Sequence, residues 1–231
     1  LAGIGINDIG YCGLKDRIAE TTQWFSLYLP KRQIGKDQLR HHAFEVLNTD
    51  RHSKKLRRGD HKGNVFNITL RETTFDRHVF RGRLNKIGSL GVPNYFGEQR
   101  FGINGNNLCN AEKLIKRGSL KGNRQGSGFY LSAARSWLFN LILASHVQDH
   151  RNGEAFPFAQ TGPLWGRGRS KAEPCMLPQE SKVLANWSEW CYALEHAGLS
   201  QERRKLIVVP SALSYDYISS NNLIIKFELP R

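Results

Sequence analysis

The chain has 231 residues, and its 34 lysines and arginines exceed its 20 acidic residues by 14, so it is strongly basic. Its 39% hydrophobic share supplies enough apolar material for a core, which argues against a disordered chain. No apolar run approaches the roughly 18–20 residues of a membrane-spanning helix.

The first part of the chain is predicted to hold two strands and a helix. Residues 23–29 and residues 64–70 alternate apolar and polar side chains, which predicts strands with one buried face. Apolar residues then recur at helical spacing over residues 74–87. Residues 91–94, Gly-Val-Pro-Asn, break this pattern and mark a candidate domain boundary.

Beyond this boundary the chain is mainly helical and then returns to strands. Apolar spacing predicts a long helix over residues 130–148 and another over residues 179–196. Residues 153–178 between them are rich in Gly and Pro and are predicted to be irregular. Strand character returns at residues 206–209, 213–218 and 223–229. The order strands, helices, strands predicts an α+β domain with a helical domain inserted into it.

The positive charge is concentrated in one segment. Residues 31–71 hold 11 basic and 4 acidic residues, and the densest part is residues 51–62. Leu56 is the one large apolar residue in that part, which excludes an amphipathic membrane helix. A solvated basic loop is one interpretation, but the charge of the whole chain favours binding to a nucleic-acid backbone.

The cysteines and histidines give no sign of a metal site. Cys12, Cys109, Cys175 and Cys191 lie far apart, so zinc and CxxC redox motifs are absent, and we expect free thiols in a reducing cytoplasm. His146 and His150 have a metal-compatible spacing on the predicted helix without an evident third ligand. The chain shows no signal peptide and opens without Met, and we expect it to be part of a longer protein.

One short polar segment could carry chemistry. In residues 13–17, Gly-Leu-Lys-Asp-Arg, Asp16 lies between Lys15 and Arg17 just before a strand. Flanking positive charge favours an ionised carboxylate, which could act as a nucleophile toward a nucleic acid. The alternative is an ordinary turn aspartate. P-loop, GxSxG and HExxH motifs are absent from the sequence.

Four ordered blocks of the sequence resemble the TruD family of tRNA pseudouridine synthases. They are GYCGLKDR with TQWF (residues 10–17 and 22–25), RHSKKLRRGDHKGNVF (51–66), VPNYFGEQRFG (92–102) and YLSAARSWLFN (130–140). The resemblance implies an α+β fold: a mixed or antiparallel-sheet catalytic domain with a mainly helical inserted domain. It places the catalytic domain at residues 1–91 and 206–231, incomplete at both ends, and the inserted domain at residues 92–205.

The resemblance also implies an activity, the isomerisation of uridine to pseudouridine at position thirteen of tRNA, beside the D stem, without metal or organic cofactor. Asp16 matches the family's essential aspartate, Asn64 its active-site asparagine, and Phe66 the aromatic that stacks on the target base. By alternation alone, Phe66 is a core residue instead. The family's essential N-terminal lysine matches no residue of this sequence.

The expected partner is tRNA, with no membrane and no obligate protein partner, and we expect a cytoplasmic monomer. The rival hypothesis is a non-catalytic RNA-binding or RNA-folding module of the same fold. The block at residues 94–102 is expected to be mainly structural, with Arg100 on a phosphate. The basic residues expected to contact RNA are Lys15, Arg17, Lys54, Lys55, Arg57, Arg58, Lys62 and Arg100.

Overall fold

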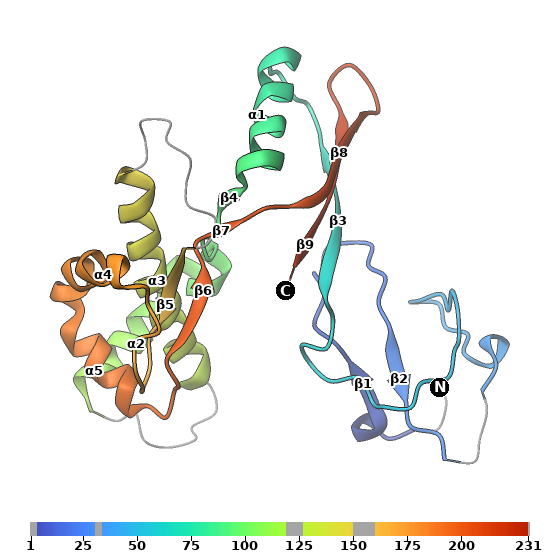
Figure 1. Cartoon of the computed structure of the whole chain (residues 1–231). Coiled ribbons are helices and arrows are strands. Elements are labelled where there is room, and N and C mark those ends of the chain that lie inside the picture. Colours follow the sequence, from blue (N-terminus) through green and yellow to red (C-terminus); the bar gives the residue numbers. More distant parts are fainter. Residues whose placement is uncertain (1–3, 31–33, 119–126, 150–159, 231) are drawn as a thin grey trace. The chain divides into compact units, whose positions relative to one another are not determined.

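The computed structural model describes residues 4–30, 34–118, 127–149 and 160–230, and the chain divides into two compact units (Figure 1). The first unit consists of Leu1–Leu70 and Ser214–Arg231, and the second of Arg71–Leu213. Helices and antiparallel strands occur together, which confirms the α+β class. Whether these units correspond to a catalytic and an inserted domain stays a prediction.

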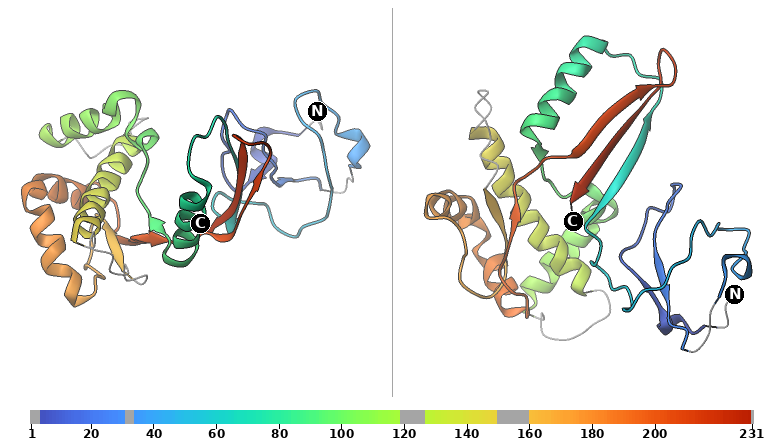
Figure 2. Two further views of the ribbon diagram at one scale, coloured as in Figure 1. Left: turned by 90° about the horizontal axis from the view of Figure 1, so that it is seen from above. Right: turned by 45° about the vertical axis from the view of Figure 1, so that its right-hand side comes forward.

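The first unit is built on antiparallel strands. β1 (Ile9–Tyr11) pairs with β2 (Phe25–Leu27), and β3 (Gly63–Leu70) pairs along its whole length with β9 (Leu223–Pro230). β8 (Ser211–Tyr217) completes a sheet in the order β3-β9-β8, and the three strands lie side by side in Figure 2. Two short 3-10 helices also belong to this unit, η1 (Ile6–Asp8) and η2 (Lys36–Gln38).

The predicted strands of this unit are largely confirmed. β3 and β9 match the predictions at residues 64–70 and 223–229, because apolar side chains at every second position lie on one face of a strand. The prediction at residues 23–29 was too long, since β1 offers only three residues for pairing with β2. Phe25 was expected on a buried face, but it is 53% exposed.

The second unit is a set of helices around one long helix, α3 (Ser127–Asp149), which confirms the strongest helix prediction. α3 packs against α2 (Asn106–Lys116), α4 (Leu177–Leu184) and α5 (Ser188–His196), as Figure 2 also shows. Short 3-10 helices complete the unit: η3 (Glu98–Phe101), η4 (Ile103–Gly105), η5 (Pro174–Met176) and η6 (Ala185–Trp187).

α3 contributes buried side chains to the core of the second unit on more than one of its sides. The predicted apolar stripe is buried at Leu131, Ala134, Leu138 and Ile142, whereas Leu141 and Ser145 are only partly buried. A second buried cluster consists of Phe139, Leu143, Met176 and Leu206. A helix that is apolar on several sides is typical of the centre of a core, which is where α3 lies.

Further elements belong to the second unit. α1 (Arg77–Leu90) begins at Asp76, whose side chain accepts hydrogen bonds from the backbone amides of His78 and Val79 at 2.6 and 3.0 Å. The helix predicted from residue 74 therefore begins at this N-terminal cap instead. Two small ladders join distant segments: β4 (Val92–Pro93) with β7 (Ile207–Val208), and β5 (Thr161–Leu164) with β6 (Glu202–Lys205).

Two predictions in the second unit were wrong in part. The helix expected over residues 179–196 is broken by η6, where the Trp187 ring meets Trp137 and Trp190 edge to face, with centroids 6.1 and 4.9 Å apart. Packing of these indoles overrides the continuous helical spacing of the sequence. Residues 153–178 were expected to be irregular, yet β5 forms within them because β6 offers it a partner; residues 153–159 lie outside the described residues.

Candidate active site

The loop that follows β1 presents Asp16 to solvent. Leu14 and Ile18, on either side of it, are 81% and 97% exposed, so the loop is not packed into a core. Within the described ranges, the Asp16 carboxylate makes no hydrogen bond or ion pair, and the guanidinium of Arg17 has no partner either. An exposed, unpartnered carboxylate between two cations is available to a ligand that approaches this loop.

A single hydrogen bond connects this loop to β3. The ammonium Nζ of Lys15 donates to Oδ1 of Asn64 at 2.6 Å. An ammonium group only donates hydrogen bonds, so this contact assigns the oxygen of the amide to Lys15 and leaves the two N–H donors of Asn64 for another partner. The structure thus brings the neighbour of Asp16 to one of the two predicted substrate-binding residues on β3.

Phe66 lies two residues further along β3, on the same face of the strand as Asn64. It is partly buried and stands directly opposite Phe227 of β9, with ring centroids 5.2 Å apart and planes 19° apart. Sequence reasoning missed Phe227: the alternation in residues 223–229 placed it on an apolar face, but nothing indicated which strand would pair with it. The stacked pair suits both predicted roles of Phe66, packing and base stacking.

The basic segment at residues 51–62 is held along the β1–β2 hairpin. The Leu56 amide donates to Ser26 Oγ at 2.9 Å, and the Gly59 amide donates to the Cys12 carbonyl at 2.7 Å, directly before the Asp16 loop. Gly10 permits this approach, because a Cβ there would lie 2.4 Å from the Leu56 carbonyl oxygen. The segment therefore lies beside the loop that carries Asp16.

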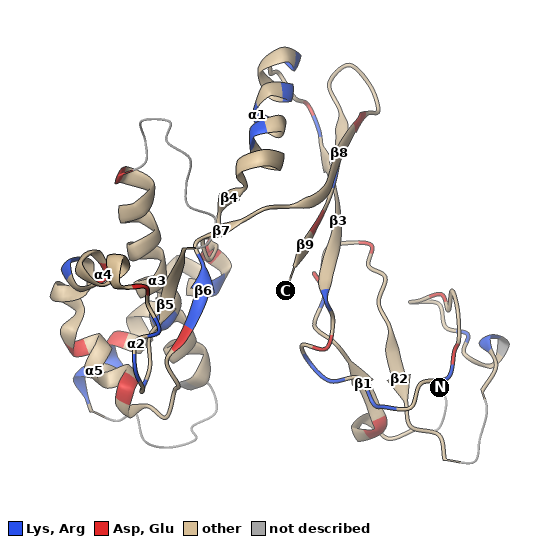
Figure 3. Ribbon diagram, viewed as in Figure 1, with Lys and Arg blue, Asp and Glu red and all other residues tan. Residues whose placement is uncertain are grey.

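The cations of this segment fall into two groups. Arg58 donates to the Tyr11 hydroxyl at 2.6 Å, and the ammonium of Lys55 donates to the Asn7 carbonyl, so both fasten the segment to the hairpin. Lys54, Arg57 and Lys62 are exposed, and within the residues that the structure describes their charged groups have no partner. These three remain available to an external anion, and Figure 3 shows blue stretches before β3.

Arg100 belongs to the second unit and is not grouped with these residues. Its guanidinium donates to Ser132 Oγ at 3.2 Å and lies over the Phe96 ring. The Phe96 backbone exchanges two hydrogen bonds with the Asn140 amide of α3, each 2.9 Å long. Phe96 and Arg100 thus contact α3 within the second unit, and the mainly structural role of residues 94–102 stays a prediction.

The described ranges contain no cluster of three or more histidine, cysteine or acidic side chains that could hold a metal ion. His146 is buried, while His150 lies outside the described residues, so the spacing of the two histidines carries no further conclusion. All four cysteines are free thiols, as predicted. No helix in the part of the chain that is described combines the length and apolar character of a membrane span.

Comparison with known proteins identifies the family. The model of the family described as tRNA pseudouridine synthase D (TruD) matches residues 2–123. A protein of Cellvibrio japonicus named tRNA pseudouridine synthase D is 44% identical over 240 residues, which cover 99% of this chain and 70% of that protein. Proteins of the same name from Nitrosococcus oceani and Marinobacter nauticus are 39% and 37% identical, over 74% and 70% of their lengths. The chain belongs to the TruD family of tRNA pseudouridine synthases.

Proposed function

We propose that this protein isomerises uridine to pseudouridine in tRNA, with Asp16 as the nucleophile. The observation that carries the proposal is the 2.6 Å hydrogen bond from Lys15 to Asn64, which joins the Asp16 loop to the strand that bears Phe66. An acid, an amide and an aromatic ring at one place supply a nucleophile, donors for a base edge and a stacking surface. The names of the family and of its relatives support the reaction and the substrate.

The chemistry asked of Asp16 is one covalent step and its reversal. Its carboxylate oxygen bonds to the target nucleotide, at the ribose C1′ or at the uracil ring, and is released when the product forms. In either case the N1–C1′ bond breaks, a C5–C1′ bond forms, C5 loses a proton and N1 gains one. Substrate and product are isomers, so no oxidant, reductant or co-substrate is consumed.

Asn64 and Phe66 would hold the target base. Taking a uridine out of its stack costs a few kcal/mol. Stacking on an aromatic ring returns about 1–3 kcal/mol per base, which offsets much of that cost. The N–H groups of Asn64 that Lys15 leaves available match the carbonyl oxygens of uracil, which only accept hydrogen bonds. The detached uracil must also be kept from water while it turns.

The exposed cations would bind the RNA backbone without reading its sequence. Lys54, Arg57 and Lys62 would replace counterions along the phosphates, together with Lys15 and Arg17 of the loop. Lys55 and Arg58 would act mainly by holding this segment beside the loop. We also propose that the modified uridine is at position thirteen, beside the D stem, and that the protein acts as a monomer in the cytoplasm, where tRNA is found.

The test uses the complete protein and unmodified tRNA transcripts. Carbodiimide treatment followed by primer extension maps each new pseudouridine as a stop. The proposal predicts one stop at the D-stem uridine, and light scattering should give the mass of one chain per tRNA. Tight binding without a stop on any transcript would favour the rival function, an RNA-binding module without turnover, to which the basic segment contributes equally.

A further inference from the structure

Two arginines of the second unit lie over one aromatic ring. The guanidinium carbon of Arg204, on β6, is 4.3 Å from the centroid of the Phe96 ring, and that of Arg100 is 5.2 Å from the same centroid. The two guanidinium groups are therefore no further apart than the sum of these distances. Arg204 is partly buried and Arg100 is exposed, so the pair extends from the packed interior to the surface.

Arg204 and Arg100 differ from Arg203 and Arg135, two partly buried arginines of the same unit. Arg203 is paired with Glu180 at 2.6 Å, and Arg135 lies 3.8 Å from Glu202. Within the described residues, neither Arg204 nor Arg100 has a carboxylate within ion-pair distance, and Nε of Arg204 is buried without a hydrogen-bond partner. Burial, and secondly the charge of Arg100, lower the pKa of Arg204. A partly buried cation without an anion is unfavourable for folding, which suggests a purpose other than stability.

The surroundings hold this pair in place. Arg204 donates to Oδ1 of Asn94 at 2.6 Å, and the Asn94 side chain donates in turn to the Lys205 carbonyl at 2.9 Å. Phe96 is fixed on α3 by the Asn140 amide. Side chains that are already ordered lose little conformational entropy when a ligand binds.

We propose that Arg204 and Arg100 form an anion site that binds a phosphodiester group of the substrate RNA, so that the second unit contributes its own backbone contact. This inference rests on the proposed function for the identity of the ligand. The planar guanidinium fork matches two phosphate oxygens, and the exposed guanidinium of Arg100 presents such donors at the surface.

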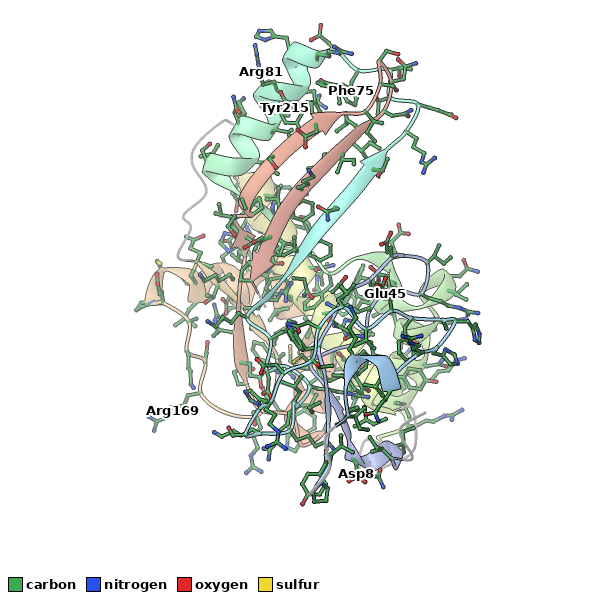
Figure 4. The ribbon with its side chains drawn as sticks, turned by 90° about the vertical axis from the view of Figure 1, so that its right-hand side faces the viewer. Asp8, Glu45, Phe75, Arg81, Arg169 and Tyr215 are labelled. Atoms are coloured by element: carbon green, nitrogen blue, oxygen red, sulfur yellow. The ribbon has the colours of Figure 1, made fainter. Side chains whose placement is uncertain are left out.

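Several cations on β6 and on the loop after β5 favour an RNA backbone over a small acidic ligand. Figure 3 shows β6 blue along most of its length, and the loop after β5 adds the exposed cations Arg167, Arg169 and Lys171. In Figure 4, Arg169 extends from this loop away from the ribbon. A polyanion can engage several such cations at once, whereas a single small anion cannot.

The experiment measures the Kd of the complete protein for an unmodified tRNA transcript by fluorescence anisotropy over a series of KCl concentrations. Arg204→Gln should raise Kd about tenfold and reduce the slope of log Kd against log salt by about one. Arg204→Lys should keep most of the slope but lose affinity, because an ammonium lacks the fork. Arg100→Gln should act in the same direction. Lys182→Gln, which removes an exposed charge from α4, is the matched control and should change Kd less than twofold.

Stability separates a binding role from a structural one. Since Arg204 is a partly buried cation without an anion, Arg204→Gln should leave the Tm of the free protein unchanged or raise it. A lowered Tm with unchanged tRNA affinity and salt slope would overturn the proposal. If the wild-type protein forms pseudouridine and both arginine variants bind normally, the anion site fails while the proposed function stands. If no pseudouridine forms but RNA binding depends on Arg204, the proposed function fails while the anion site stands.

Discussion

Lys15 and Asn64 are 49 positions apart in the sequence, yet the Lys15 ammonium donates a 2.6 Å hydrogen bond to the Asn64 side-chain oxygen. The contact fixes which end of the amide faces the Asp16 loop and which end remains for a substrate. We infer from it a role for Lys15 that is separate from binding phosphate: to position Asn64.

This role predicts a specific kinetic change. Lys15→Met should lower kcat about 10- to 100-fold, the loss expected for one hydrogen bond to a charged group, because the Asn64 amide is then free to turn over. KM for tRNA should rise much less. Lys15→Arg retains a donor and should recover part of the rate. A Lys15→Met enzyme with normal kcat and a raised KM would show that Lys15 only binds backbone.

The two interpretations of Phe66 make different predictions. If Phe66 stacks on the target base, Phe66→Leu should lower kcat/KM by about 5- to 150-fold, while Phe66→Tyr stays near wild type. Phe227→Leu is the matched control, because it removes the ring opposite Phe66 and should change stability more than kcat/KM. Equal and small kinetic effects of the two leucine variants would identify Phe66 as a packing residue. Single-turnover kinetics on a tRNA transcript measure the difference.

The free cations of residues 51–62 predict a change in salt dependence. Replacing Lys54, Arg57 and Lys62 together by Gln should reduce the slope of log Kd against log salt by about two to three, because three phosphate contacts are lost. Tm should stay unchanged, since these side chains have no partners among the described residues. An unchanged slope would remove this segment from the RNA interface.

The environment of Cys191 predicts how fast its thiol reacts and how its contribution to stability depends on pH. Burial, and secondly the charge of Glu195, raise the pKa of the Cys191 thiol to about 12. In the native protein at pH 8, Ellman's reagent should therefore modify the exposed Cys109 and Cys175 quickly and Cys191 only after unfolding.

The folded state holds the proton of the Cys191 thiol more tightly than the unfolded chain does, because the thiol pKa in the unfolded chain is about 8.5. The contribution of Cys191 to stability is thus complete below that pH and declines as pH rises toward 12. Rapid labelling of three thiols in native Cys12→Ser protein would contradict the predicted protection of Cys191.

Sequence predicted the elements whose side-chain pattern is regular and missed those that depend on a partner. The alternation in β3 and the apolar stripe of α3 are visible in the residues themselves. β6, Glu-Arg-Arg-Lys, has no apolar alternation and is a strand because β5 pairs with it. The break at Ala185–Trp187 depends likewise on the indoles that meet there.

The candidate site shows the same division. Asp16, Asn64 and Phe66 were proposed from their motifs, but the contact between Lys15 and Asn64 depends on how a loop meets a strand far along the chain. The pair of Phe66 with Phe227 depends on strand register, which alternation alone does not give. The charge of the basic segment was evident from the sequence. The hydrogen bonds by which Lys55 and Arg58 hold the segment to the hairpin were not.

Turnover by Asp16→Asn tests the nucleophile directly, because this variant loses the carboxylate but keeps its shape. Glu20→Gln, an exposed carboxylate four residues further along, is the control for loss of charge. Pseudouridine should be mapped by carbodiimide and primer extension, with tRNA affinity measured on the same samples. We expect at least about a thousand-fold loss of product for Asp16→Asn, affinity within a few-fold of wild type, and normal turnover for Glu20→Gln. Product formation by Asp16→Asn at more than a tenth of the wild-type rate would contradict the assignment of Asp16 as the nucleophile.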